Sequence, residues 1–128
     1  MEHPLVVVCE AGHRLANLLR IQAPGRRWLL RHVTSADACR EALPRSAPGV
    51  LVVDLDVKRP AALDLLAWVQ EHRPSVAPVA ALAAASPTLA LAAWELGARH
   101  VLPPERVPAD LAAVVSALIE GVWAEGEA

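Results

Sequence analysis

The chain has 128 residues, of which 55% are hydrophobic, and its 14 acidic and 12 basic side chains give a formal net charge of -2. This length predicts one domain with its own core, and the dispersed arginines argue against a surface that binds nucleic acid. No apolar run is long enough to span a bilayer. The start, Met1 to Pro4, lacks the basic region of a secretory signal, so we expect a cytoplasmic protein.

Apolar, strand-like runs alternate with helical patterns five times, which predicts a parallel sheet covered by helices. The second strand is the most polar of the five, which favours a position at the edge of the sheet. We expect one domain over 1–121 and a C-terminal tail over 122–128. The predicted strands are 5–9, 28–33, 50–54, 78–83 and 100–102.

Two helix starts carry clear sequence patterns. Thr34 or Ser35 can cap the second helix by accepting the free amide hydrogens of its first turn. Ser86 followed by Pro87 predicts the start of the fourth helix, since a hydroxyl cap is often followed by proline at the first helical position.

The third predicted strand leads to the main candidate residue. Residues 50–53 are all apolar, as expected for a central strand buried on both faces. Asp54 follows at the carboxyl end, the edge where open α/β sheets place their sites. Chemistry at this carboxylate competes with a structural role, in which it caps a turn or pairs with an arginine. Asp56 is more typical of a turn residue.

The order of these elements resembles the receiver domain of response regulators in two-component signalling. The run 62–66 (Ala-Leu-Asp-Leu-Leu) is similar to the family's Gly-Leu-Glu-Leu-Leu, Pro78-Val79 to its Pro-Val, and Gly97-Ala98 to its Gly-Ala. The resemblance covers nearly the whole chain. It implies a doubly wound, flavodoxin-like α/β fold with five parallel strands in the order 2-1-3-4-5.

In that family two acids after the first strand hold Mg²⁺, and an aspartate after the third strand accepts a phosphoryl group. Carried over, the acidic pair falls on Cys9 and Glu10, and the acceptor falls on Asp54. A rival register places Asp56 in the acceptor position, because Pro60 lies four residues later; we prefer Asp54. A thiol is a poor ligand for Mg²⁺, which prefers oxygen, so Glu10 and Asp54 would form at best a weak metal site.

The family also uses a hydroxyl after the fourth strand and a lysine after the fifth to bind the aspartyl phosphate. Here the hydroxyl position falls on Ala83 or Ala84, and the lysine position falls on Pro103 or Pro104. Val101 replaces the switching aromatic residue. The resemblance therefore implies a degenerate receiver of bacterial signalling that acts through protein contacts, without phosphorylation and without a cofactor.

Two alternatives remain open at this point. One is a conventional phosphoacceptor that uses Asp54 with Glu10 and Mg²⁺. The other is a cysteine-dependent phosphoryl-transfer enzyme that uses Cys9, because residues 7–12 resemble the start of a thiolate loop. Arg14 lies one residue too near for the Cys-x5-Arg spacing of such phosphatases. We expect no enzyme activity, and we expect Cys9 to behave as a small buried hydrophobic residue.

The fourth predicted helix carries a candidate interaction surface. Leu89, Ala93 and Leu96 form its inward face, so Leu91 and Trp94 should lie on the opposite, exposed face. Tryptophan is enriched at binding hot spots, and the resemblance implies partner contact through this helix, the fifth strand and the fifth helix. The competing interpretation is that Trp94 packs over a neighbouring helix.

Overall fold

The computed structural model describes residues 3–23, 25 and 27–127, with side chains up to Gly121. Five parallel strands form one sheet in the order β2-β1-β3-β4-β5, and a helix follows each strand. The predicted doubly wound fold and strand order are therefore confirmed. The elements are β1 Leu5–Cys9, α1 Arg14–Gln22, β2 Leu29–Val33, α2 Ala36–Ala42, β3 Gly49–Leu55, α3 Ala61–His72, β4 Val76–Leu82, α4 Pro87–Glu95, β5 His100–Leu102 and α5 Val107–Glu127.

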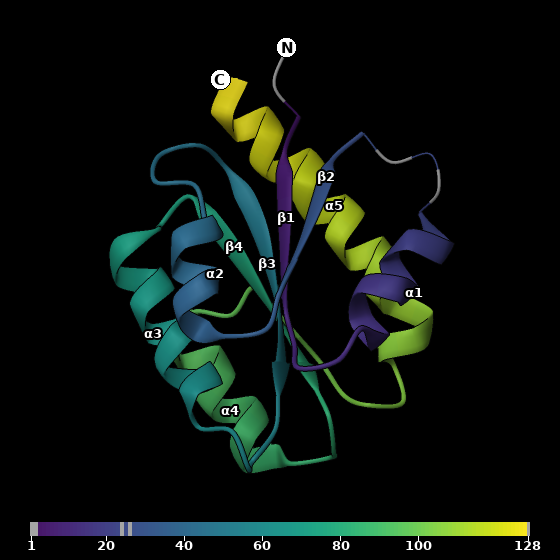
Figure 1. Ribbon diagram of the computed structural model, residues 1–128, viewed down its shortest axis with the longest axis vertical. Helices are drawn as coiled ribbons and strands as arrows, with labels where there is room; N and C mark the ends of the chain where they lie inside the picture. Colours follow the sequence, from purple (N-terminus) through teal and green to yellow (C-terminus); the bar gives the residue numbers. More distant parts are fainter. Residues whose placement is uncertain (1–2, 24, 26, 128) are drawn as a thin grey trace.

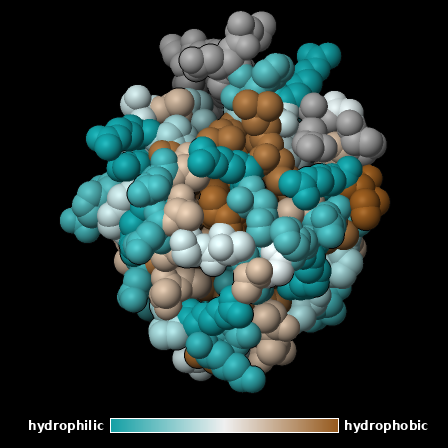
Figure 2. Space-filling model, viewed as in Figure 1, coloured by the Kyte–Doolittle hydropathy of each residue, from teal (hydrophilic) through white to brown (hydrophobic). Residues whose placement is uncertain are grey.

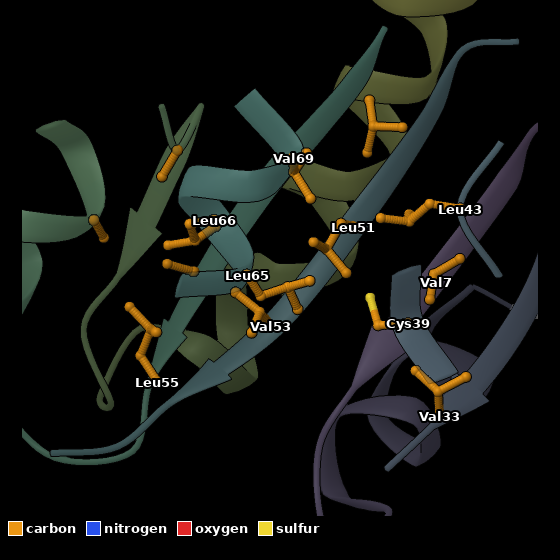
Figure 3. Packing of buried hydrophobic residues seen from close by; sticks show 14 of the residues in the cluster. Val7, Val33, Cys39, Leu43, Leu51, Val53, Leu55, Leu65, Leu66 and Val69 are labelled. Atoms are coloured by element: carbon orange, nitrogen blue, oxygen red, sulfur yellow. The ribbon is translucent and has the colours of Figure 1, made fainter. Parts of the chain in front are cut away.

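The helices cover the two faces of the sheet unequally. Helices α1 and α5 lie on one face, and α2, α3 and α4 lie on the other (Figure 1). Alternation along the strands assigns side chains to these layers. In β3, Val50 and Val52 pack toward α1 and α5, whereas Leu51, Val53 and Leu55 pack toward α2 and α3 (Figure 3).

Strand β3 is longer than predicted and runs through Asp54 to Leu55. The extension follows from its pairing, because Asp54 lies opposite Ala81 and Leu55 opposite Leu82 in β4. Asp54 thus belongs to the last part of the strand, and its carboxylate stays at the carboxyl edge of the sheet.

Both predicted helix starts are present. The Ser35 hydroxyl accepts the Ala38 amide of α2 at 3.1 Å. The Ser86 hydroxyl accepts the Leu89 amide of α4 at 3.1 Å. Ser35, one of the two alternatives, is therefore the cap of α2.

The end of the chain differs from the prediction. Helix α5 continues to Glu127, so the backbone is helical over 122–127, where we expected a tail. Gly121 is the residue that suggested a break, but one glycine costs a helix only about 1 kcal/mol, and the alanines and glutamates around it favour helix.

The exposed face of α4 is confirmed. Leu91 is 59% exposed and Trp94 is 50% exposed, whereas Ala93 is fully buried. After α4 the chain turns at Gly97, whose φ of +99° is a conformation that other residues rarely adopt. A Cβ atom there would lie 3.1 Å from Cδ of Gln70 on α3. The end of α4 therefore lies close against α3.

The surface seen from the β2 edge is mostly hydrophilic, with an apolar patch over the start of β2 (Figure 2). Leu29, the first residue of β2, is 57% exposed. Within the described part of the chain, each helix is too short or too polar to cross a bilayer.

Candidate functional site

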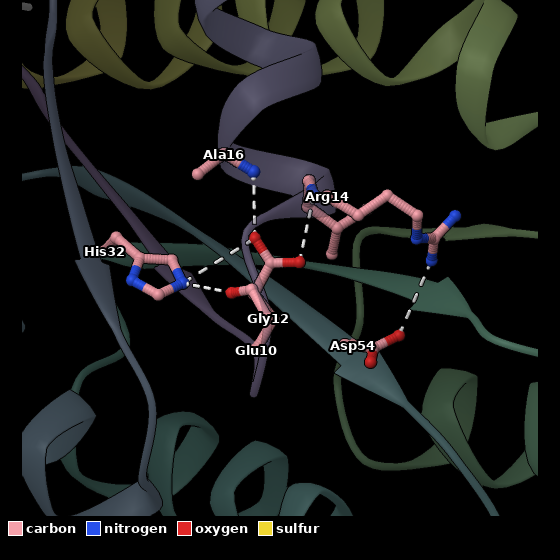
Figure 4. Close-up of polar contacts among 7 residues, drawn as sticks. Glu10, Gly12, Arg14, Ala16, His32 and Asp54 are labelled. Carbon is pink, nitrogen blue, oxygen red and sulfur yellow. Dashed lines mark hydrogen bonds and ion pairs between the residues drawn. The ribbon is translucent and has the colours of Figure 1, made fainter.

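Asp54 faces an arginine at the carboxyl edge of the sheet. Its side chain is 24% exposed, and its Oδ1 lies 3.8 Å from Nη2 of Arg14, the first residue of α1 (Figure 4). Burial raises the pKa of Asp54, while the charges of Arg14 and Arg59 act in the opposite direction. Of the two roles weighed for Asp54, the observed contact matches pairing with an arginine.

Glu10 is turned away from Asp54 and into the start of α1. Its side chain is almost fully buried, and its two carboxylate oxygens accept the backbone amides of Leu15 and Ala16, each at 2.9 Å (Figure 4). Both amides belong to the first turn of α1, where helical amides lack partners within the helix. A carboxylate is also favoured by the positive end of the helix dipole. Glu10 therefore acts as the cap of α1.

His32 of β2 closes the other side of Glu10. Its Nε2 lies 2.6 Å from the backbone oxygen of Gly12 and 3.8 Å from Oε2 of Glu10. Its ring stacks on His13 at a centroid distance of 4.5 Å. The loop between β1 and α1 is thus tied to the edge strand, and both histidines lie in this structural cluster.

These residues do not fit the magnesium site of the resemblance. Both oxygens of Glu10 already accept amide hydrogens, Asp54 faces the cationic Arg14, and Cys9 offers sulfur to a cation that prefers oxygen. Among the described residues there is also no group of three His, Cys, Asp or Glu side chains that could hold a metal ion. The assignment of Glu10 and Asp54 as metal ligands stays a prediction without geometric support.

Cys9 lies on the opposite face of β1 from Glu10. Its Sγ is 3.7 Å from the backbone oxygen of Ser35, and it packs against the core layer that contains Cys39 of α2. Hydrogen bonding with the Cys39 thiol lowers the pKa of Cys9, opposed by burial and by the charges of Asp54 and Glu10. Hydrogen bonding with Cys9, together with burial, raises the pKa of Cys39.

A small hollow opens between Asp54 and Cys9. Its volume is about 90 Å³, and it lies between the ends of β1 and β3 and the starts of α2 and α3. Cys9, Asp54 and Arg59 are among its lining residues. Asp56 is not: its carboxylate accepts the amide of Lys58 at 3.0 Å in the turn after β3. This geometry favours Asp54 over the rival register and makes Asp56 a turn residue.

The two residues that directly follow β4, and the two that directly follow β5, carry neither a charge nor a hydroxyl group. Ala83 and Ala84 follow β4 and are exposed. Pro103 and Pro104 follow β5. The nearest hydroxyl along the chain, Ser86, is engaged in capping α4. The groups that would bind an aspartyl phosphate are therefore replaced by small apolar side chains.

Sequence reasoning missed four residues of this region: Arg14, His32, Cys39 and Arg59. Arg14 could have been found, because an arginine at the first position of α1 lies at the same sheet edge as Asp54. The sequence also contained a hint of Cys39. Cys9 is two residues after Val7 in the same strand, so both side chains face the side of the sheet opposite α1, where α2 and Cys39 lie. The stacking of His13 on His32 had no sequence pattern to indicate it.

Comparison with known proteins supports the architecture. No family model matches the sequence, and no curated protein matches it. Among solved structures, the signal receiver domain of a Luxo repressor protein from Vibrio parahaemolyticus superposes with a TM-score of 0.82 at 22% identity, over 98% of this chain and 96% of that one.

Two further structures show the same likeness. A CheY-like response regulator receiver domain protein from Methanospirillum hungatei has a TM-score of 0.77 at 12% identity, covering 97% of this chain and 99% of its own. A response regulator receiver protein from Pseudoalteromonas atlantica has a TM-score of 0.77 at 14% identity, with 92% and 98% covered. The resemblance to receiver domains is therefore confirmed at the level of the fold, and the chain has the receiver fold.

Proposed function

We propose that this protein is a receiver-like signalling module that works through protein contacts, in the cytoplasm, and without phosphorylation of Asp54. The observation that carries the proposal is the pair formed by Asp54 and Arg14 beside a Glu10 that caps α1. The receiver fold supplies the general role in signalling. The state of its acidic edge supplies the claim that phosphorylation is not used.

The chemistry of phosphoryl transfer explains the second claim. A carboxylate attacks phosphorus only when cations neutralise the oxygens that approach it, and the resulting acyl phosphate needs donors that hold it. Arg14 and Arg59 give positive charge near Asp54. The positions of the family's donors fall on Ala83 or Ala84 after β4 and on Pro103 or Pro104 after β5, so little would stabilise the product or report it to the rest of the fold.

Acetyl phosphate with Mg²⁺ tests this proposal directly. We expect intact-mass spectrometry to find no appreciable phosphoryl adduct on the wild-type protein. Asp54→Asn and Asp56→Asn are the matched variants. A stoichiometric gain of one phosphoryl group that Asp54→Asn abolishes and Asp56→Asn retains would establish the conventional phosphoacceptor and overturn the proposal.

The partner surface in this proposal is the face formed by α4, β5 and α5, with Leu91 and Trp94 at its centre. Both side chains are at least half exposed, and large exposed apolar groups side by side are typical of contact surfaces. We propose that a second copy of the chain binds here. Other protein partners would use the same two side chains.

Sedimentation of the variant Leu91→Ala/Trp94→Ala tests this surface. Loss of a hot-spot tryptophan costs about 2 kcal/mol of binding, so self-association should weaken roughly 30-fold, with little change in Tm. Ile21→Ala is the control, because Ile21 is 76% exposed on α1, which covers the other face of the sheet. Unchanged association, or an equal loss in the control, would remove this face from the proposal.

The enzyme alternative receives no support from the surroundings of Cys9. A phosphatase loop surrounds its thiolate with amide donors, whereas the Cys9 sulfur lies 3.7 Å from a carbonyl oxygen, that of Ser35. We therefore retain a role without enzyme activity.

A further inference from the structure

Cys9 and Cys39 come together across two layers of the fold. In β1, Val6 and Val8 face α1 and α5, while Val7 faces α2 and α3. Cys9 has the parity of Val7, so the pleat directs its sulfur toward the layer that holds Cys39. The sulfur of Cys39 points from α2 toward the sheet (Figure 3).

A shared partner fixes the two residues at close range. The backbone oxygen of Ser35 lies 3.7 Å from Sγ of Cys9 and accepts the Cys39 amide at 3.0 Å. Cys9 also packs against the buried cluster that contains Cys39, so the two side chains share one layer of the core. Both are free thiols, in the last residue of a strand and in the middle of a helix.

The two thiols differ in access. Cys39 is fully buried, whereas Cys9 is only partly buried and lines the hollow of about 90 Å³ beside Asp54. One water takes about 30 Å³ in the liquid, so a hydrogen peroxide molecule, with two oxygens, fits this space. An oxidant would therefore reach Cys9 first, and Cys39 would be positioned to react with the product.

We propose that Cys9 and Cys39 form a peroxide-sensitive thiol pair that closes to a disulfide between β1 and α2. In the first step the Cys9 sulfur attacks one peroxide oxygen: an S–O bond forms, the O–O bond breaks, and the second oxygen leaves as water with the thiol proton. In the second step the Cys39 sulfur attacks the Cys9 sulfur, the S–S bond forms, and the S–O oxygen leaves as a second water. The two sulfurs together lose two electrons, which the peroxide gains.

The consequence of this reaction is a covalent link beside Asp54. The last residue of β1 would be joined to α2, so the wall of the hollow would become fixed. This inference concerns the thiols alone and does not depend on the proposed function.

Intact-mass spectrometry of the whole chain under native conditions tests the pair, with hydrogen peroxide as the only oxidant. We expect a mass loss of about two daltons, equal to two hydrogen atoms, that dithiothreitol reverses. Peptide mapping should show Cys9 joined to Cys39 within one chain. Because the fold holds the thiols together, the linked product should form at least about tenfold faster in the native chain than in urea.

Two variants assign the steps. Cys39→Ala should stop at the sulfenic acid of Cys9, which dimedone traps as a stable adduct. Cys9→Ala should leave Cys39 unoxidised over the same period. The comparison of native with unfolded wild type keeps the test decisive even if a variant folds poorly. Three results for the wild-type protein would overturn the proposal. They are a gain of oxygen without the loss of two hydrogens, disulfides only between chains, and a linked product that forms no faster in the native chain than in urea.

Discussion

The carboxyl edge of the sheet divides into two halves that keep different parts of the receiver pattern. The charged half, near the ends of β1 and β3, contains two separate pairs, Glu10 with His32 and Asp54 with Arg14. The uncharged half, at the ends of β4 and β5, contains Ala83, Ala84, Pro103 and Pro104. In the first half the acids cap a helix and pair with a cation, whereas the residues that directly follow β4 and β5 are small and apolar.

This difference teaches that an acid at a position where the receiver family has a metal ligand can serve the fold of a helix. Glu10 is one of the residues that carried the resemblance, yet its two oxygens serve the fold of α1. The helix start that it stabilises is enough to explain a carboxylate at this position. Ala83 and Pro103, which directly follow β4 and β5, carry no polar side chain.

The largest change in stability should come from Glu10→Ala. The variant leaves two buried amides of α1 without an acceptor, which costs about 2–3 kcal/mol and lowers Tm by roughly 10 °C. Thermal melts with and without Mg²⁺ measure this. Glu71→Ala, at an exposed position of α3, is the control and should change little. If Glu10→Ala kept the Tm of the wild type and lost only the change in Tm that Mg²⁺ causes, Glu10 would be a metal ligand. The contrast between the two halves of the edge would then be wrong.

A smaller effect is expected at the boundary of the uncharged half. Ser86→Ala removes the acceptor of the Leu89 amide, and the loss of such a cap costs about 1 kcal/mol. Denaturant unfolding gives the value, with Ser46→Ala in an exposed position as the comparison. Equal stabilities for Ser86→Ala and wild type would leave this hydroxyl free for another role.

The smallest change in stability should come from Asp54→Asn, and this variant should be more stable than the wild type. Burial raises the pKa of Asp54 in the folded state, so the folded chain binds its proton more tightly than the unfolded chain does. Stability therefore falls as pH rises from the usual aspartate pKa through the raised one. The variant should gain about 1 kcal/mol or less at pH 7 and nothing in strong acid. Melts across this range would count against the assignment if the gain grew toward low pH.

Much of the fold could be predicted from local patterns. The apolar run 50–53 identified a central strand, Ser86 with Pro87 placed the start of α4, and the spacing of Leu91 and Trp94 gave its exposed face. These features depend on neighbours within one element. Strand ends were less certain, because β3 and β4 extend each other through pairing that no single segment contains.

The candidate site could be located but not described from the sequence. Asp54 was found because an acid after an apolar strand stands out. The direction of the Glu10 side chain could not be predicted, because a carboxylate at a strand end can face either a cation or a helix start. Only the packing of the folded chain decides between them. The packing of Cys9 against the cluster that contains Cys39 depends on where the crossover places α2.

The turn after α4 also bears on recognition. Gly97 lets the chain leave α4 directly beside Gln70 of α3, in a backbone conformation that a side chain would strain. A side chain at Gly97 would press on Gln70 of α3 and strain the backbone just after α4, although Gly97 lies outside the exposed face of α4. Substitution of Gly97 is therefore a way to shift Leu91 and Trp94 relative to a docked protein without changing either residue.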